Sequence, residues 1–86
     1  MTTVLDLINA GLVTSGTRLT WKRRGGSTSI AEIQSNGFLK TEDGSLHKSP
    51  SGAARKFVGR PIDGWAVWRT PSGESLSDLR KKVTGL

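Results

Sequence analysis

Residues 49–54 read Ser-Pro-Ser-Gly-Ala-Ala, and the pair Gly64-Trp65 and a further Trp68 follow them. Ser49 is a favourable N-cap, and Pro50 suits the first helical position because its missing N–H needs no partner there. Apolar residues then recur at helical spacing until Gly59 ends the pattern. The stretch therefore predicts a helix over 50–58, followed by an aromatic-rich strand over 65–70.

Short strands are predicted between residues 18 and 48. Over 18–24, Leu19 and Trp21 point to one face, and cationic or hydroxyl side chains point to the other. Gly25-Gly26 ends this strand, and two turn pairs, Asn36-Gly37 and Asp43-Gly44, separate further short strands over 29–34, 38–40 and 45–48. This pattern is typical of an antiparallel meander.

Two more helices are predicted near the ends of the chain. Thr3 and Asp6 form a capping-box pattern, and an apolar face follows, made of Val4, Leu5, Ile8 and Leu12. Ser75 and Asp78 form a second such pattern, with Leu76, Leu79 and Val83 on the buried face. We therefore predict an α+β fold, a single domain over 1–86 with a small antiparallel sheet and helices packed on one face, in the order α-β-β-β(β)-α-β-α.

The composition limits the classes of function. A chain of 86 residues with 34% apolar residues can build one modest core, which leaves little room for a deep catalytic pocket. The chain has no cysteine and one histidine, so we expect no disulfide, no structural zinc site and no cofactor. The N-terminus lacks the pattern of a signal peptide and no apolar run is long enough to span a bilayer, so we expect a soluble, cytoplasmic protein.

The charge favours a polyanionic partner. Thirteen Lys and Arg residues against seven Asp and Glu residues give a net charge of +6. The cations cluster at 18–24, at 48–60 and at 80–82, although the last cluster also suits the negative end of a helix dipole. A solvated basic surface would explain such a charge without any ligand, but the clustering favours nucleic acid.

The start of the helix at residue 50 is a candidate phosphate site. A helix N-terminus presents free N–H groups and a partial positive charge, and cations lie on both sides of this one. Capping alone can explain Ser49 and Pro50, or the same turn can also hold a phosphate. If Ser51 faces that phosphate, we expect its removal to affect DNA binding more than stability. The residues predicted to contact DNA phosphates are Lys22, Arg23, Arg24, Lys48, Ser49, Ser51, Arg55 and Lys56.

Several of these motifs together resemble the RAMA domain, a module associated with restriction enzymes and adenine methylases. The resemblance rests on the helix over 5–12 with the following Thr17-Arg18-Leu19-Thr20-Trp21, the Asp43-Gly44 turn, Ser49-Pro50-Ser51 with Ala53-Ala54, Gly64-Trp65, and Gly73 with Leu76 and Leu79. It implies a non-catalytic reader of DNA, particularly of DNA with modified bases such as N6-methyladenine, that acts beside restriction or methylase proteins. Two positions depart from the pattern, since His47 stands where an aromatic residue is common and Gly52 where Ala is common.

The tryptophans and His47 are the candidates for contacting a base. Trp21 shares a face with Leu19 and is expected in the core. On a strand, Trp65 and Trp68 point to opposite faces, and the pairing with Gly64 favours Trp65 as the core residue. Trp68, helped by His47, is then the predicted base contact, although a second core position for Trp68 also fits the sequence.

An enzyme is not expected, and no catalytic residue is assigned. The carboxylates are scattered among turns and helix starts, and no recognisable arrangement of a nucleophile and an orienting carboxylate surrounds His47. The alternative to a DNA-binding module is an adaptor that docks an acidic protein. The sequence leaves open whether the nucleic acid is DNA or RNA, and which oligomeric state the protein adopts.

Overall fold

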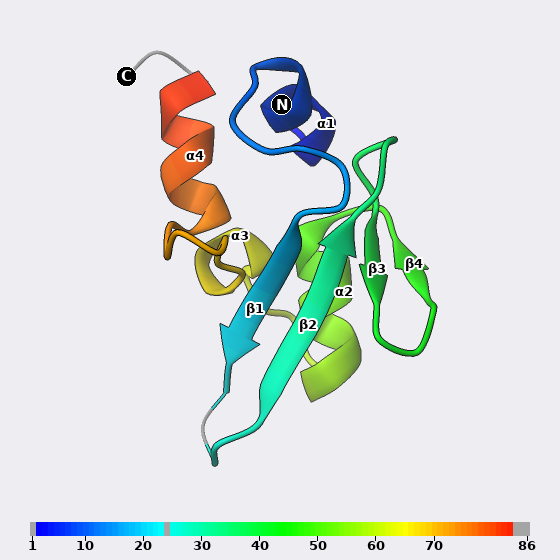
Figure 1. Ribbon diagram of the computed structural model, residues 1–86. Helices are drawn as coiled ribbons and strands as arrows, with labels where there is room; N and C mark the ends of the chain where they lie inside the picture. The colour runs from blue at the N-terminus through cyan, green and yellow to red at the C-terminus, as the bar shows by residue number, and fades with distance from the viewer. Residues whose placement is uncertain (1, 24, 84–86) are drawn as a thin grey trace.

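The computed structural model describes residues 2–23 and 25–83. The elements in these residues are the helices α1 (Val4–Asn9), α2 (Pro50–Val58), α3 (Gly64–Val67) and α4 (Leu76–Val83), and the strands β1 (Arg18–Lys22), β2 (Thr28–Ile33), β3 (Leu39–Thr41) and β4 (Leu46–His47). Figure 1 shows them coloured along the chain.

The strands form one antiparallel sheet in the order β1-β2-β3-β4, so each strand pairs with its neighbour in sequence. Leu19 lies opposite Ala31, and both are buried, while the residues on either side of Leu19 are exposed. The same alternation buries Leu39 on β3. The predicted meander is therefore confirmed, and one face of the sheet is apolar because every second side chain points to it.

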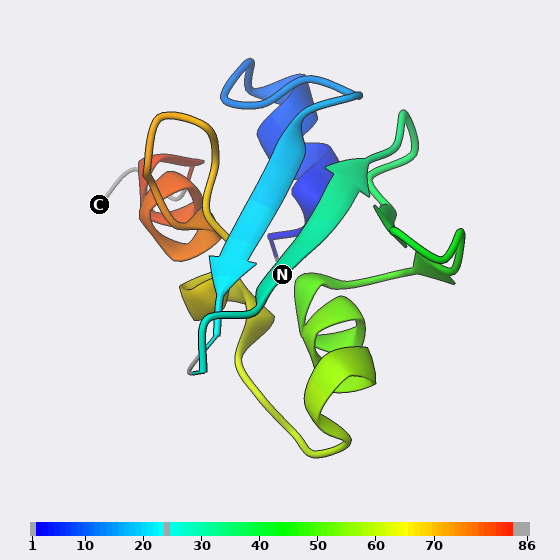
Figure 2. The same ribbon diagram turned by 60° about the horizontal axis from the view of Figure 1, so that its bottom comes forward.

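The helices cover this apolar face. In Figure 1, α2 lies behind the strands, α3 lies beside β1, and α1 and α4 stand together at one end. The turned view of Figure 2 shows the outer face of β1 and β2 free of helices. The core between the layers contains Leu7, Leu19, Ile33, Leu39 and Leu76, all fully buried. The predicted α+β class, with helices on one face, is confirmed.

The helix starts follow the local sequence patterns. Thr3 and Asp6 form a capping box at α1, and Ser75 and Asp78 exchange the same pair of bonds at α4. Ser49 Oγ accepts the Gly52 N–H at the start of α2, and Gly59 ends that helix with a φ of 67°. The predicted apolar face of α1 is wrong at one position. Leu5 is 39% exposed, and Leu7 is buried together with Val4.

The segment 65–70 is not the predicted strand. Residues Gly64–Val67 form helix α3, whose start is capped by the Asp63 carboxylate through the Trp65 N–H at 3.0 Å. The extended backbone is reduced to Arg69, which bridges Thr20 on β1 and Ser75 before α4. The predicted order of elements is kept, with this bridge in the place of the last strand.

The two tryptophans of this segment also exchange the positions predicted for them. Trp68 is fully buried, and Trp65 is only partly buried, with the Arg80 guanidinium 4.6 Å from the centre of its ring. The reason is the helical turn of α3, in which Gly64 and Trp68 lie four residues apart on the same side and face the core. Trp21 faces the core as predicted and is partly buried against Trp68, at 5.9 Å between ring centres.

Four residues join α2 to α3, and we call this contact the α2–α3 junction: Pro50, Ser51, Gly64 and Trp68. The Trp68 indole Nε1–H donates to the Pro50 carbonyl at 3.0 Å, and the Gly64 N–H donates to Ser51 Oγ at 3.0 Å. A Cβ on Gly64 would lie 2.1 Å from the carbonyl carbon and oxygen of Pro50. Only glycine therefore allows α3 to approach the first turn of α2 this closely.

None of the helices in the described residues has the length and apolar character needed to cross a bilayer.

Candidate nucleic-acid interface

A hollow of about 250 Å³ lies beside the first turn of α2. We call it the α2 hollow, and it is lined by Ser49, Ser51, Gly52, Arg55, Pro61 and Ile62. Arg55 is exposed, and the exposed Lys48 immediately precedes the helix cap. The structure thus brings together three of the predicted phosphate-binding residues, Ser49, Ser51 and Arg55, and Lys48 precedes Ser49 in the chain.

The backbone of this helix start offers little to an anion. Pro50 has no N–H, the Gly52 N–H donates to Ser49 Oγ at 3.1 Å, and the Ala53 N–H donates to the Ser49 carbonyl at 3.1 Å. The remaining amide is that of Ser51, and Gly64 covers it. A Cβ built on Gly64 would lie only 2.4 Å from the Ser51 nitrogen. Our expectation that free helix amides hold the phosphate therefore loses its basis.

The side chains of the α2 hollow retain their hydrogen-bond donors. Ser49 Oγ and Ser51 Oγ both act as acceptors for a backbone N–H, so each hydroxyl still has its own proton to donate. The Arg55 guanidinium adds further donors in a planar array that suits phosphate oxygens. The chemistry of the hollow is that of an anion site made of hydroxyl and guanidinium groups.

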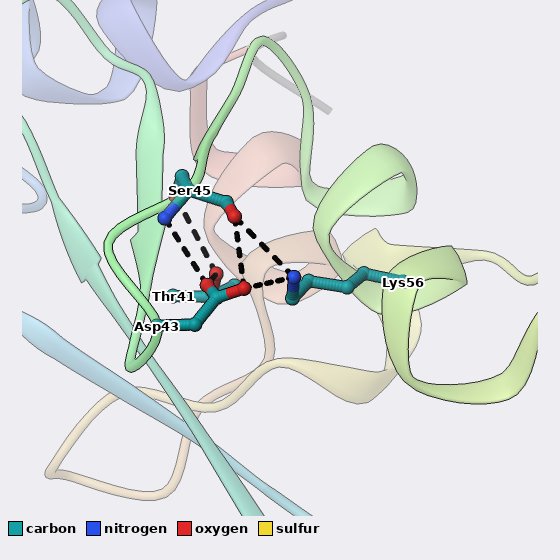
Figure 3. Close-up of polar contacts among 4 residues, drawn as sticks. All are labelled: Thr41, Asp43, Ser45 and Lys56. Carbon is teal, nitrogen blue, oxygen red and sulfur yellow. Dashed lines mark hydrogen bonds and ion pairs between the residues drawn. The ribbon is translucent and has the colours of Figure 1, made fainter.

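Lys56, another predicted phosphate contact, is paired with residues of the protein itself. Its Nζ forms an ion pair with Asp43 in the turn between β3 and β4 and contacts Ser45 Oγ at 3.3 Å (Figure 3). Asp43 also accepts bonds from the Thr41 hydroxyl at 2.6 Å and the Ser45 N–H at 3.1 Å. Lys56 and these donors hold the pKa of Asp43 well below its usual range, because they all favour the charged carboxylate. Lys56 thus fastens α2 to the sheet.

Arg23 is also occupied inside the protein. Its guanidinium lies 5.2 Å from the centre of the Phe57 ring and 5.9 Å from that of Trp21, and Nη1 donates to the Phe57 carbonyl at 3.5 Å. Lys22 is exposed at the end of β1. Arg24, the third predicted contact of this cluster, lies outside the described residues. The phosphate roles of these residues remain predictions.

The two predicted base contacts are both turned inward. Trp68 has no exposed surface, so our expectation that it stacks on a base is wrong for this conformation. His47 pairs with Leu39 across β3 and β4 and is partly buried, and its Nε2 is buried with no partner in the described part of the chain. Its role at a base is therefore restricted to the exposed part of the ring.

The outer face of the sheet has mixed charges. Glu32 on β2 lies opposite Arg18 on one side and Lys40 on the other, and Glu42 lines the same shallow surface. Alternating charges of this kind balance one another, so the face lacks the single sign of charge that attracts a polyanion. The cations that remain exposed elsewhere include Lys48, Arg55, Arg60 and Arg69.

A second depression was not expected from the sequence. It is a groove of about 630 Å³ beside the edge of β1, and we call it the β1-edge groove. Its lining residues are Thr20, Trp21, Lys22, Ala66, Val67, Arg69, Thr70, Pro71 and Gly73. No local sequence pattern predicts this groove, because its two walls come from segments more than forty positions apart in the sequence.

Several carboxylates cap helices. Asp6, Asp63 and Asp78 bind backbone N–H groups at helix starts, and Ser75 lowers the pKa of Asp78 by donating to it. Within residues 2–23 and 25–83, no three His, Asp or Glu side chains gather where they could hold a metal ion. Asp6, Asp63 and Asp78 thus serve local structure.

A family model matches nearly the whole chain. The model of the family described as Restriction Enzyme Adenine Methylase Associated, or RAMA, matches residues 1–85. No curated protein matches the sequence significantly.

Proposed function

Because the chain belongs to the RAMA family, which is associated with restriction enzymes and adenine methylases, we propose that it is a non-catalytic module that binds duplex DNA. DNA is the substrate that those enzymes share. In this proposal the chain delivers or retains a restriction or methylase protein at its DNA. The observation that supports DNA as the ligand is the α2 hollow, where two serine hydroxyls and Arg55 line one surface next to Lys48.

The binding energy in this proposal comes mainly from phosphates. The net charge of +6 raises the local concentration of the polyanion, and each cation that neutralises a phosphate releases a counterion. The hydroxyl groups of Ser49 and Ser51 then fix the position of the backbone relative to α2. Such contacts position a duplex without reading its sequence.

We further propose that the module distinguishes duplexes with modified bases, such as N6-methyladenine. A methyl group on a base is recognised by an apolar or aromatic surface of the protein. Trp68 cannot provide this surface while it stays buried in the core. A reader of this kind therefore needs another exposed aromatic residue.

The central experiment is a binding titration with two duplexes of the same sequence, one of them carrying N6-methyladenine, each at two salt concentrations. We expect both duplexes to bind more weakly at high salt, with log K falling by about 0.9 per phosphate contacted for each unit of log salt. Tighter binding of the methylated duplex supports base reading. Binding that does not change with salt contradicts the phosphate mechanism, and a failure to bind either duplex favours an adaptor for acidic proteins.

The position of the interface is tested by single cation removals. Arg55→Ala and Lys48→Ala should each weaken binding and reduce the salt slope by about one. Lys40→Ala, on the charge-balanced outer face of the sheet, is the matched control and should leave the slope unchanged. An equal effect of all three substitutions would mean that the charge acts as a whole and that the α2 hollow is not the interface.

A further inference from the structure

The β1-edge groove combines an aromatic wall with apolar neighbours. Trp21 stands on one side and is partly buried, and Val67 and the exposed Ala66 of α3 form the other side. The Trp21 ring is held in place by its edge-to-face contact with Trp68, at an angle of 71° between the rings. A volume of about 630 Å³ is in the range of small-molecule sites, which is about 300–1,000 Å³.

The groove also has a polar strand edge. Thr20 exchanges two backbone hydrogen bonds of 2.9 Å with Arg69, while the residues on either side of Thr20 turn their backbone groups toward β2. Because this direction alternates along a strand, the N–H and C=O of Lys22 point to the same edge as those of Thr20. The groove therefore presents a donor and an acceptor next to the Trp21 ring.

Cations stand at its rim. Lys22 and Arg69 both line the groove and are exposed, and no acidic residue lines it. Arg69 is fixed in place by a bond from Nη1 to the Gly73 carbonyl at 2.9 Å, which leaves its other guanidinium N–H groups available. An aromatic wall, a donor and acceptor pair and a cationic rim match the flat face of a base, its hydrogen-bonding edge and the flanking phosphates.

We infer that the β1-edge groove binds one unstacked base of a bound nucleic acid, with the base stacked on Trp21 and the flanking phosphates near Lys22 and Arg69. This inference rests on the proposed DNA function and gives it the exposed aromatic contact that Trp68 does not supply. The Lys22 backbone pair faces the hydrogen-bonding edge of the base.

The test compares a short oligothymidylate with an abasic strand of the same number of phosphates. Both strands present the same backbone charge, but only the first has bases to stack. We expect the oligothymidylate to bind roughly 5- to 150-fold more tightly, which corresponds to stacking of a single base. In the NMR spectrum, the indole N–H signal of Trp21 should shift with the oligothymidylate and not with the abasic strand.

The structure supplies an internal control for this measurement. The Trp68 indole N–H is buried and bonded to Pro50, so its signal should stay in place with both strands. Equal affinities for the two strands, or a Trp21 signal that does not move, would overturn the inference that the groove binds a base. If salt-sensitive duplex binding persists in that case, the proposed function stands without this inference, and if no duplex binds, both fail.

A substitution that leaves every core side chain in place gives a second test. Ala66→Phe should fill the groove from an exposed position on α3, and we expect it to bind both strands equally. Ala10→Phe, at the exposed end of α1, is the matched control and should keep the preference for bases. If Ala66→Phe keeps the full preference, or alters only the self-association of the protein, the groove does not bind a base.

Discussion

Helix α2 is fastened to the rest of the molecule at two places that differ in their chemistry. At its first turn, the α2–α3 junction is made of neutral hydrogen bonds around the fully buried Trp68. In its second half, Lys56 reaches the turn between β3 and β4 through the exposed ion pair with Asp43. The junction contains the Ser-Pro-Ser, Gly64 and Trp68 positions that stand out in the sequence. No sequence pattern predicts the ion pair between Lys56 and Asp43.

The two fastenings should therefore respond to different disturbances. A buried donor or acceptor that loses its partner keeps its full desolvation cost, so the junction should be sensitive to any change of shape. An exposed ion pair is screened by water and salt and contributes little to stability, so it should respond mainly to pH. The following substitutions test this difference, starting with the largest expected effect.

Trp68→Ala should have the largest effect. It removes a fully buried indole and leaves the Pro50 carbonyl without its donor, and truncations of this kind cost about 3–5 kcal/mol. This is a large share of the total stability of a small domain, about 5–15 kcal/mol. Urea unfolding measures it, with Trp65→Ala as the partly buried control. A smaller loss of unfolding free energy for Trp68→Ala than for Trp65→Ala would contradict the stabilising role of the α2–α3 junction.

Gly64→Ala should come next. The new methyl group would lie 2.1 Å from backbone atoms of Pro50, which cannot move aside as a flexible side chain can. We expect a loss at the upper end of the about 1–3 kcal/mol that overpacking costs. Gly52→Ala is the control in the same helix start, where the nearest atom is Ser49 Oγ at 3.3 Å, and should change stability by less than about 1 kcal/mol. Thermal melts of both variants decide the comparison.

Ser51→Ala should cost about 1 kcal/mol, because the part-buried Gly64 N–H loses its acceptor. The sequence alone predicted a smaller loss of stability for Ser51→Ala than for Ser49→Ala. Ser49→Ala removes the cap of α2 and should cost a similar amount, about 1 kcal/mol. Comparing the melting temperatures with the DNA titrations of both variants separates the two roles. Unchanged stability in Ser51→Ala would show that the Gly64 bond contributes nothing.

Asp43→Asn should have the smallest effect, and one that depends on pH. The pKa of Asp43 is lowered in the folded protein, so its contribution to stability is full above its unfolded value of about 3.8 and is lost as the pH falls below it. The difference in Tm between the parent and Asp43→Asn should therefore shrink toward zero as the pH drops below about 4. Lys56→Ala should behave similarly, while Ser51→Ala should keep a constant difference across this range.

Local patterns in the sequence were sufficient for much of the fold. Caps such as Ser49 and Ser75 act on residues within the same turn, and the alternation around Leu19 reports which face is buried. Interactions of this range depend on neighbours in the chain, so the sequence displays them directly. The meander, α2 and the helix at each end were all predicted for this reason.

The segment 65–70 could not be predicted in the same way. Its tryptophans and valine favour a strand by propensity, but the tight contact of Gly64 with α2 and the Trp68 bond to Pro50 decide its conformation. Both contacts join residues distant in sequence. The one local clue was Asp63, a favourable N-cap directly before Gly64.

The candidate site was predicted in part. Ser49, Ser51 and Arg55 do share one surface, because they lie within two turns of a single helix. The engagement of Lys56 with Asp43 and of Arg23 with Phe57 depends on packing between elements, and so does the β1-edge groove. Charge alone therefore predicts the class of ligand, and tertiary contacts determine which cations are available to it.

The order of the strands in the sheet has a consequence for how the chain folds. Because β1, β2, β3 and β4 each pair with a neighbour across a short loop, little chain entropy opposes the closing of each hairpin, and such local topologies fold fast. The α2 hollow and the β1-edge groove both have walls from residues beyond 60, which must dock onto elements formed earlier in the chain. We expect the meander to form first and the two depressions to be completed last, so that the capacity to bind arises only with the final step of folding.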